Sequence, residues 1–185
     1  MAVQLVYETH SISVDNERGI ATGHLPGELS AEGRRLAKKL GERRWDDGLA
    51  CVFTSDLRRA VETAEIAFLG SELEIRQDAR LRECDYGELN GAPVEQLEPR
   101  RRFVDEPYPG GESYRDCVEH MRSFLADVAA DFDGRRVLVI AHSAQRWALR
   151  HLLEGVPLED LVDAPFDWQE GWEYEVPVGG ARSPE

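Results

Sequence analysis

Apolar and polar positions along this chain fall into two kinds of run, short apolar segments and longer amphipathic ones. The short segments are rich in β-branched and aromatic residues, which is typical of buried strands. The last of them lies close to the C-terminus and predicts an edge strand. The predicted strands cover 3–8, 51–54, 73–76, 136–141 and 172–176.

The longer segments repeat their apolar residues every three or four positions, as the buried face of a helix does. The longest helix is expected where apolar positions from Tyr114 to Phe132 alternate by four and three. Ser30 stands directly before another amphipathic segment and is its predicted N-cap. The predicted helices cover 30–44, 56–69, 93–98, 112–131 and 143–154.

Strands that alternate with helices predict a mostly parallel sheet with helices on both faces. We therefore expect an α/β fold, a three-layer α/β/α sandwich, built as a single domain over residues 1–185. Residues 83–113 hold several glycines and prolines and predict a long insertion at the active site. Residues 177–185 predict a disordered tail.

Composition narrows the class of protein. The chain has 185 residues, of which 42% are hydrophobic and 31% charged, an ordinary globular profile. No apolar run approaches the roughly 20 residues that span a bilayer, and no secretory signal is visible, so we expect a cytoplasmic protein. The three cysteines are odd in number and lack metal-type spacing, which favours buried thiols.

Net charge bears on the partners. The formal charge of −14 argues against binding to nucleic acid or to an anionic membrane surface. It leaves a small anionic substrate open, because a local group of arginine and histidine can hold a phosphate inside an acidic protein. The oligomeric state stays open, a homodimer included.

Two histidines carry the strongest signal of chemistry. His10 and His142 each stand just past the C-terminal end of a predicted strand. Ligands of parallel α/β sheets bind outside these strand ends. Two imidazoles brought together there suggest a nucleophile and a partner that orients a phosphate.

Four segments place these histidines in a wider pattern. His10 is followed by Asn16 six residues later and by Gly23 seven further on. The other segments run Ser-Asp-Leu-Arg-Arg-Ala-Val-Glu-Thr-Ala over 55–64, Leu-Arg-Glu over 81–83 with Tyr86-Gly87 and Gly91 beyond it, and Ala-His-Ser over 141–143. Together, and in this order, they resemble the histidine phosphatase superfamily, which includes the phosphoglycerate mutases. The resemblance covers about residues 3–155.

The resemblance implies a phosphomonoester hydrolase that acts on a small phosphorylated metabolite through a phosphohistidine, with mutase activity less favoured. His10 would attack phosphorus, and Glu83 would protonate the leaving oxygen and then activate water. Arg59 and His142 would hold the phosphate oxygens. Asn16 and Ser143 are expected beside the phosphate. This scheme requires no metal and no cofactor.

The chain departs from the family pattern at its first motif. The arginine before the nucleophile is Thr9, and the glycine after it is Ser11. Thr9 offers one hydroxyl and no charge, so activity toward phosphate esters is expected to fall by roughly 10²–10³ unless another cation takes over. Arg146 is the main candidate for that cation, ahead of Arg18 and Arg82; it fits a solvated helix position equally well. Ser143 stands in place of a second glycine.

These losses leave alternatives to a simple phosphatase. The first is a repurposed or weakened member that binds a phosphorylated or carboxylated small molecule. The second is an enzyme with non-phosphatase biosynthetic chemistry in the same pocket. A metal site at His10 with Asp15, or at His142 with Asp85, is weaker because no metal-binding signature supports it.

The remaining candidates have plainer interpretations. His120 and His151 fall within predicted helices and fit ordinary helix residues, whereas His24 lies in a loop within possible reach of substrate. Trp168 and Trp172 fit packing. The run Arg100–Arg102 fits a solvated surface, but it lies on the insertion and could select anionic substrates.

Overall fold

The computed structural model describes residues 1–179, and its regular elements follow the predicted alternation. Tertiary packing of the apolar faces sets where each element begins and ends. The strands are β1 (Val3–Thr9), β2 (Cys51–Thr54), β3 (Ile75–Gln77), β4 (Arg136–Ala141) and β5 (Trp172–Val176). The α-helices are α1 (Val14–Glu17), α2 (Ala31–Arg44), α3 (Arg58–Ala67), α4 (Tyr114–Asp131), α5 (Ser143–Leu149) and α6 (Leu158–Val162).

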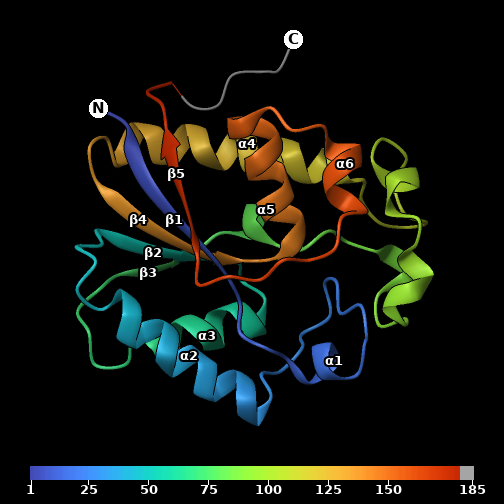
Figure 1. The fold of residues 1–185 in the computed structure, drawn as a ribbon, viewed down its shortest axis with the longest axis horizontal. Helices are drawn as coiled ribbons and strands as arrows, with labels where there is room; N and C mark the ends of the chain where they lie inside the picture. Colours follow the sequence, from blue (N-terminus) through green and yellow to red (C-terminus); the bar gives the residue numbers. More distant parts are fainter. Residues whose placement is uncertain (180–185) are drawn as a thin grey trace.

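The five strands form one sheet in the order β3-β2-β4-β1-β5. Four strands are parallel, and β5 pairs antiparallel with β1 at the edge of the sheet. Helices α2 and α3 cover one face, and α4, α5 and α6 lie on the other (Figure 1). The α/β/α sandwich with a mostly parallel sheet is therefore confirmed.

Each face of the sheet has its own apolar core. The larger core packs under α4 and α5 around residues such as Tyr7, Phe124 and Val139. The smaller one packs under α2 and α3 around residues such as Val6, Leu40 and Ile140. Neighbouring strand residues thus serve opposite faces, as the period of two along a strand requires.

Several predicted boundaries move by a few residues. The helix expected over 56–69 begins at Arg58, without a side-chain N-cap, and the strand expected over 73–76 lies at Ile75–Gln77. Ser30 caps α2 as predicted, because its Oγ accepts a hydrogen bond from the Gly33 amide at 3.1 Å. The helix expected over 143–154 is α-helical only to Leu149 and continues as a π-turn over Arg150–Glu154.

Residues 83–113 contain short 3₁₀ turns in place of longer elements. These turns lie at Gly87–Leu89, Val94–Leu97 and Arg100–Phe103, so the helix expected over 93–98 is a single 3₁₀ turn. Two further short helices, α1 and α6, have no periodic pattern long enough to reveal them.

One buried charge was hidden inside a run that the sequence presents as apolar. Glu8 in β1 is only 1% exposed and pairs with Arg43 at 2.8 Å and Arg44 at 2.9 Å, both from α2. Burying a carboxylate away from water costs free energy. The two guanidinium groups offset this cost for Glu8, which would otherwise be a buried charge without a partner. This cluster fastens the last turn of α2 to the end of β1, two residues before His10.

The described residues contain no helix long and apolar enough to cross a membrane. Within the tail that the sequence predicts to be disordered, Pro177–Gly179 belong to no helix or strand. Residues 180–185 lie outside the described residues.

Candidate active site

The two histidines meet at the carboxyl ends of adjacent parallel strands. β1 ends at Thr9, which pairs with Ala141 at the end of β4. The His10 amide donates a hydrogen bond to the Ala141 carbonyl at 2.9 Å, and the two imidazole centroids are 5.0 Å apart. Strand pairing thus fixes the spacing of two side chains that are 132 positions apart in the sequence.

The tautomer of His10 is set by the backbone. Its Nδ1 lies 2.7 Å from the Ser11 carbonyl, which can only accept, so Nδ1 carries the proton and Nε2 keeps its lone pair. Burial, and then the positive charge of Arg59, lowers the pKa of His10 to about 3. The ring is therefore neutral near pH 7, the state that a nucleophile needs.

Helix α3 holds the chain on the far side of His10. The Thr63 hydroxyl accepts a hydrogen bond from the Ser11 amide at 3.1 Å and donates one to the Arg59 carbonyl at 2.7 Å. These hydrogen bonds are buried, so losing either one would leave a polar atom without a partner away from water. Thr63 therefore positions the Ser11 peptide that orients His10.

His142 is almost fully buried and is held from two sides. Its Nε2 lies 2.6 Å from the Ser55 hydroxyl, at the end of β2, and its carbonyl accepts a hydrogen bond from the Tyr7 hydroxyl at 2.5 Å. Its Nδ1 is buried without a partner among the described residues. Burial, followed by the charge of Arg59, lowers the pKa of His142 well below its usual value. A neutral ring with one free nitrogen is ready to accept a proton and an anion together.

Arg59 is a buried cation whose charge acts on both rings. It lies in the first turn of α3 and is only 2% exposed. Its guanidinium donates to the Gly23 carbonyl at 2.9 Å and to the Leu25 carbonyl at 3.2 Å, so it anchors the loop above it. Burial lowers the pKa of Arg59. An anionic ligand in the cavity would offset the free-energy cost of burying this positive charge.

Glu83 reaches the site from the loop after β3. Its Oε1 accepts hydrogen bonds from the Cys84 amide at 3.0 Å and from the Ala144 amide, in the first turn of α5, at 3.2 Å. Its carbonyl lies 2.8 Å from Nε2 of His24. Burial raises the pKa of Glu83, although the amides and Arg59 act in the other direction.

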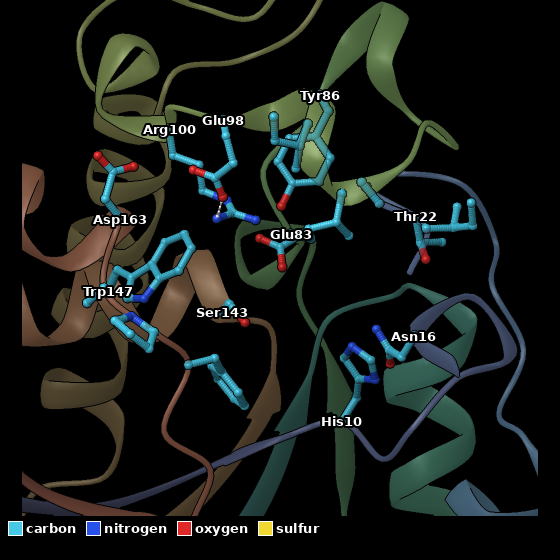
Figure 2. A pocket seen from close by; sticks show the side chains of 18 of the residues that line it. His10, Asn16, Thr22, Glu83, Tyr86, Glu98, Arg100, Ser143, Trp147 and Asp163 are labelled. Carbon is cyan, nitrogen blue, oxygen red and sulfur yellow. Dashed lines mark hydrogen bonds and ion pairs between the residues drawn. The ribbon is translucent and has the colours of Figure 1, made fainter. Parts of the chain in front are cut away.

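A cavity of about 440 Å³ opens over His10, Arg59 and Glu83, while His142 is buried beside His10 and does not itself line the cavity. Figure 2 shows Glu83 across the cavity from His10, with Glu98 and Arg100 farther away. Asn16 also lines it, although its Oδ1 already accepts a hydrogen bond from the Ser13 amide in the capping box of α1. The lining includes His10, Asn16, Thr22, Gly23, Arg59, Glu83, Tyr86, Val94, Leu97, Glu98, Arg100, Ser143, Trp147, Asp163, Pro165 and Phe166.

Arg146, the predicted substitute for the arginine missing at position 9, packs away from the cavity. Its guanidinium carbon lies 3.8 Å from the centroid of the Trp172 ring, so the side chain packs against β5 outside the cavity lining. Its role as a phosphate ligand stays a prediction. The side chain lies against Trp172 because a residue one helical turn after His142 can face a different neighbour. Thr9 also lies outside the lining, and Arg82 is paired with Asp56.

Arg100 is the cation that the insertion does bring to the cavity. It comes from the 3₁₀ turn after Pro99, pairs with Glu98 and leaves Nε without a partner among the described residues. Its neighbour Arg101 pairs with Asp163, which ties the insertion to the end of α6. From the sequence, the run 100–102 had two interpretations, a solvated surface or a group that selects anionic substrates.

Three supporting residues had no predicted role. Ser55 and Thr63 lie within the motif over 55–64, yet only the structure shows that one contacts His142 and the other the His10 loop. Tyr7 had no signal beyond its place in a strand. The motif could have indicated the first two, because a hydroxyl that recurs in a phosphate-binding pattern is a candidate hydrogen-bond partner.

Comparison with known proteins now decides the family. A model of the histidine phosphatase superfamily (branch 1) matches residues 8–170. The chain belongs to this superfamily. The resemblance found in the sequence is thereby confirmed.

Two relatives of this superfamily member are named phosphatases. PhoE of Bacillus subtilis, an uncharacterized phosphatase, is 34% identical over 127 residues, which cover 69% of this chain and 65% of that protein. This chain therefore spans less than two thirds of PhoE. Phosphoserine phosphatase 1 of Hydrogenobacter thermophilus is 30% identical over 165 residues, covering 84% and 78%.

The fold of this chain has close matches among solved structures. YhfR of Bacillus stearothermophilus superposes with a TM-score of 0.86 at 27% identity, covering 98% of this chain and 95% of that one. The match extends over the insertion as well as the sheet. Phosphatases thus occur among its relatives, while the substrate is a separate question.

Proposed function

We propose that this protein hydrolyses the phosphate monoester of a small metabolite through a phosphohistidine at His10. The observation that carries the proposal is a pair of neighbouring imidazoles, one with a fixed proton and a free lone pair and the other with a buried nitrogen that hydrogen-bonds to no described residue. His10 has its proton fixed on Nδ1 by the Ser11 carbonyl, and His142 has a buried Nδ1 without a partner among the described residues. Membership of the superfamily and the phosphatase names of two relatives support the same reaction class.

In the first step, His10 Nε2 attacks phosphorus and the bond from phosphorus to the ester oxygen breaks. The Nδ1 proton stays on the Ser11 carbonyl side, so positive charge on the ring is stabilised as the new bond forms. Because strand pairing and Thr63 fix the ring, little reorganisation is needed at the moment of attack.

Arg59 and His142 stabilise the charge on the transferred phosphoryl group. Arg59 adds a buried cation beside the cavity, where a charge interacts more strongly than in water. If the Ser55 hydroxyl donates to Nε2 of His142, the proton of that ring lies on Nδ1 and can be donated to a phosphate oxygen. Ser143 and Asn16 complete the polar side of the lining.

Glu83 is the group placed to handle protons. It gives a proton to the ester oxygen as the alcohol leaves. In the second step it takes a proton from the water that attacks the phosphohistidine, which releases phosphate and regenerates His10. Its anchoring by the Cys84 and Ala144 amides holds one carboxylate oxygen and leaves the other for these transfers.

A second function is favoured by the shortage of cations. Position 9 is neutral, Arg146 packs on Trp172, and the Arg59 guanidinium already donates to two carbonyls. A site of this kind could bind a phosphorylated or carboxylated molecule without fast turnover, or use the pocket for other chemistry. The proposed phosphatase therefore depends on whether Arg59, His142 and Arg100 suffice.

The experiment that separates these functions measures phosphate release from a broad panel of phosphate monoesters between pH 5 and 8. Wild type is compared with His10→Ala and with His151→Ala, a matched change of a histidine that contacts the Val156 carbonyl away from the cavity. A labelled substrate and an alkaline quench, in which phosphohistidine is stable, test for the intermediate.

Release and labelling that vanish only in His10→Ala support the proposal. A folded protein that binds phosphate or vanadate by calorimetry but releases none from any ester supports the binding function and rejects the hydrolase. Product formation that depends on His10 or Glu83 without phosphate release would indicate repurposed chemistry.

A further inference from the structure

Two buried cysteines and a glutamate converge behind the candidate active site. Cys84 directly follows Glu83, and Glu112 and Cys117 lie before and within the first turns of α4. The ligand atoms of the three residues all lie within 4.8 Å of one another. Both cysteines are free and at most 1% exposed, whereas Glu112 is partly exposed.

The contacts around the cluster hold Cys84 beside Glu112, because the Cys84 thiol donates a hydrogen bond to the Glu112 carbonyl at 3.7 Å. Glu112 uses Oε2 to accept a hydrogen bond from the Asp85 amide at 3.0 Å, which leaves Oε1 available. That oxygen lies 3.7 Å from Nδ1 of His120. His120 stands three residues after Cys117, so both side chains lie on one face of α4. The cluster thus has two thiols at its buried side and a carboxylate and an imidazole at its solvent side.

This donor set matches a borderline-soft divalent cation. Thiolates select zinc over calcium and magnesium, which prefer oxygen ligands. Zinc binds sulfur at about 2.3 Å and oxygen at about 2.0–2.2 Å in tetrahedral geometry. Ligand atoms of one zinc ion therefore lie about 3.5–4 Å apart, so a cluster that fits within 4.8 Å needs only a small contraction.

We propose that Cys84, Glu112 and Cys117 bind one zinc ion, with the fourth position at the solvent side beside His120. Two sulfur–zinc bonds form as the two thiol protons pass to the solvent, and one oxygen–zinc bond forms at Glu112. The spacing along the chain hid this site, because its residues come from two segments that only the fold brings together.

The ion would act through structure and take part in no step of the reaction. The Cys84 amide holds the Glu83 carboxylate, and the Asp85 amide is bonded to Glu112. Fastening Cys84 to α4 would fix the segment that carries Glu83. The proposal does not rest on the proposed hydrolase, because zinc binding is measured without any substrate.

The test uses the full chain, without a histidine tag, prepared under reducing conditions. Cobalt(II), a spectroscopic stand-in for zinc, is titrated and the thiolate-to-cobalt charge-transfer band is recorded; bound zinc is then counted by elemental analysis. The variants are Cys84→Ser, Cys117→Ser and, as matched control, Cys51→Ser, whose buried thiol lies at the start of β2. Circular dichroism checks that each variant folds.

We expect wild type and Cys51→Ser to bind one equivalent with the thiolate band and to gain thermal stability from zinc. Both other variants should lose the band and this gain. The proposal is overturned if wild type shows no thiolate band, or if the band survives in Cys84→Ser and Cys117→Ser. Isolation of a Cys84–Cys117 disulfide in a protein that takes up no zinc would likewise overturn it and assign the pair to redox chemistry.

Discussion

The floor and the roof of the cavity are built in different ways. The floor comprises His10, His142 and the residues that hold them, Tyr7, Ser55, Arg59 and Thr63. It stands on strand ends and the first turns of α3, and its side chains are held by hydrogen bonds, with Nδ1 of His142 as the only buried polar side-chain atom left without a partner among the described residues of the floor. The roof comprises residues 86–103 and 163–166, which contain 3₁₀ turns and surface ion pairs such as Arg101 with Asp163.

This difference divides the chemistry from the choice of substrate. Buried hydrogen bonds in the floor are costly to break, because each loss leaves a polar group without water. Surface ion pairs contribute only about 0–1 kcal/mol each, so the exposed charged residues of the roof can change with little loss of stability. Its buried residues Tyr86, Leu97 and Phe103 belong to the larger apolar core and are not free to change in this way. Substitutions in the floor should therefore alter rate constants, and substitutions in the roof should alter substrate affinity.

The largest expected effect follows from removing the nucleophile. His10→Ala should lower kcat by about 10⁶-fold in an active wild type, because no phosphohistidine can form. Steady-state phosphate release with the best ester from the panel measures this, and His151→Ala should stay near wild type. If His10→Ala retains more than a small fraction of the wild-type rate, His10 is not the nucleophile.

Glu83→Gln is expected to have the next largest effect and to depend on the alcohol. For an alkyl phosphate, whose leaving group needs a proton, kcat should fall by about 10²–10⁴-fold. For 4-nitrophenyl phosphate, whose leaving group needs none, the rate of His10 phosphorylation should fall far less. Burst kinetics with both esters make the comparison. Equal losses with the two esters would show that Glu83 acts through structure rather than as a proton donor.

The sequence predicted the floor better than the roof, for a physical reason. Strand ends follow from apolar runs and a parallel sheet gathers them at one edge, so His10 and His142 could be brought together without coordinates. The direction in which a helical side chain points could not be predicted in this way. Arg146 was chosen because it lies one turn after His142, but its contact with the Trp172 ring depends on how α5 packs against β5. Arg100 was ambiguous because irregular turns have no period that tells an inward from an outward residue.

Acid should destabilise the floor in a way that one substitution can isolate. His10 has a pKa of about 3 in the fold and the ordinary 6.5 when unfolded, so between these values the unfolded chain binds one more proton. This contribution to stability is complete above pH 6.5 and is lost as the pH falls. Within the window, the wild-type free energy of unfolding should fall by about 1.4 kcal/mol more per pH unit than that of His10→Ala.

Urea denaturation of the two proteins at several pH values from 4 to 6 measures this difference. Other titrating groups, Glu83 and His142 included, are present in both proteins and largely cancel in the comparison. Parallel pH dependences for wild type and His10→Ala would mean that His10 takes up a proton in the folded state, contrary to its burial beside Arg59.

The smallest effect is expected in the roof, and it tests the comparison most directly. Arg100→Gln removes a cation from the lining that is 17% exposed and already paired with Glu98. If Arg100 contacts the substrate equally in the ground and transition states, KM should rise by about five- to tenfold while kcat stays within about twofold. Arg102→Gln, an exposed neighbour on the same turn, is the control. A loss confined to kcat would instead place Arg100 with Arg59 as a cation of the reaction itself, which would mean that the roof supplies the charge missing at Thr9.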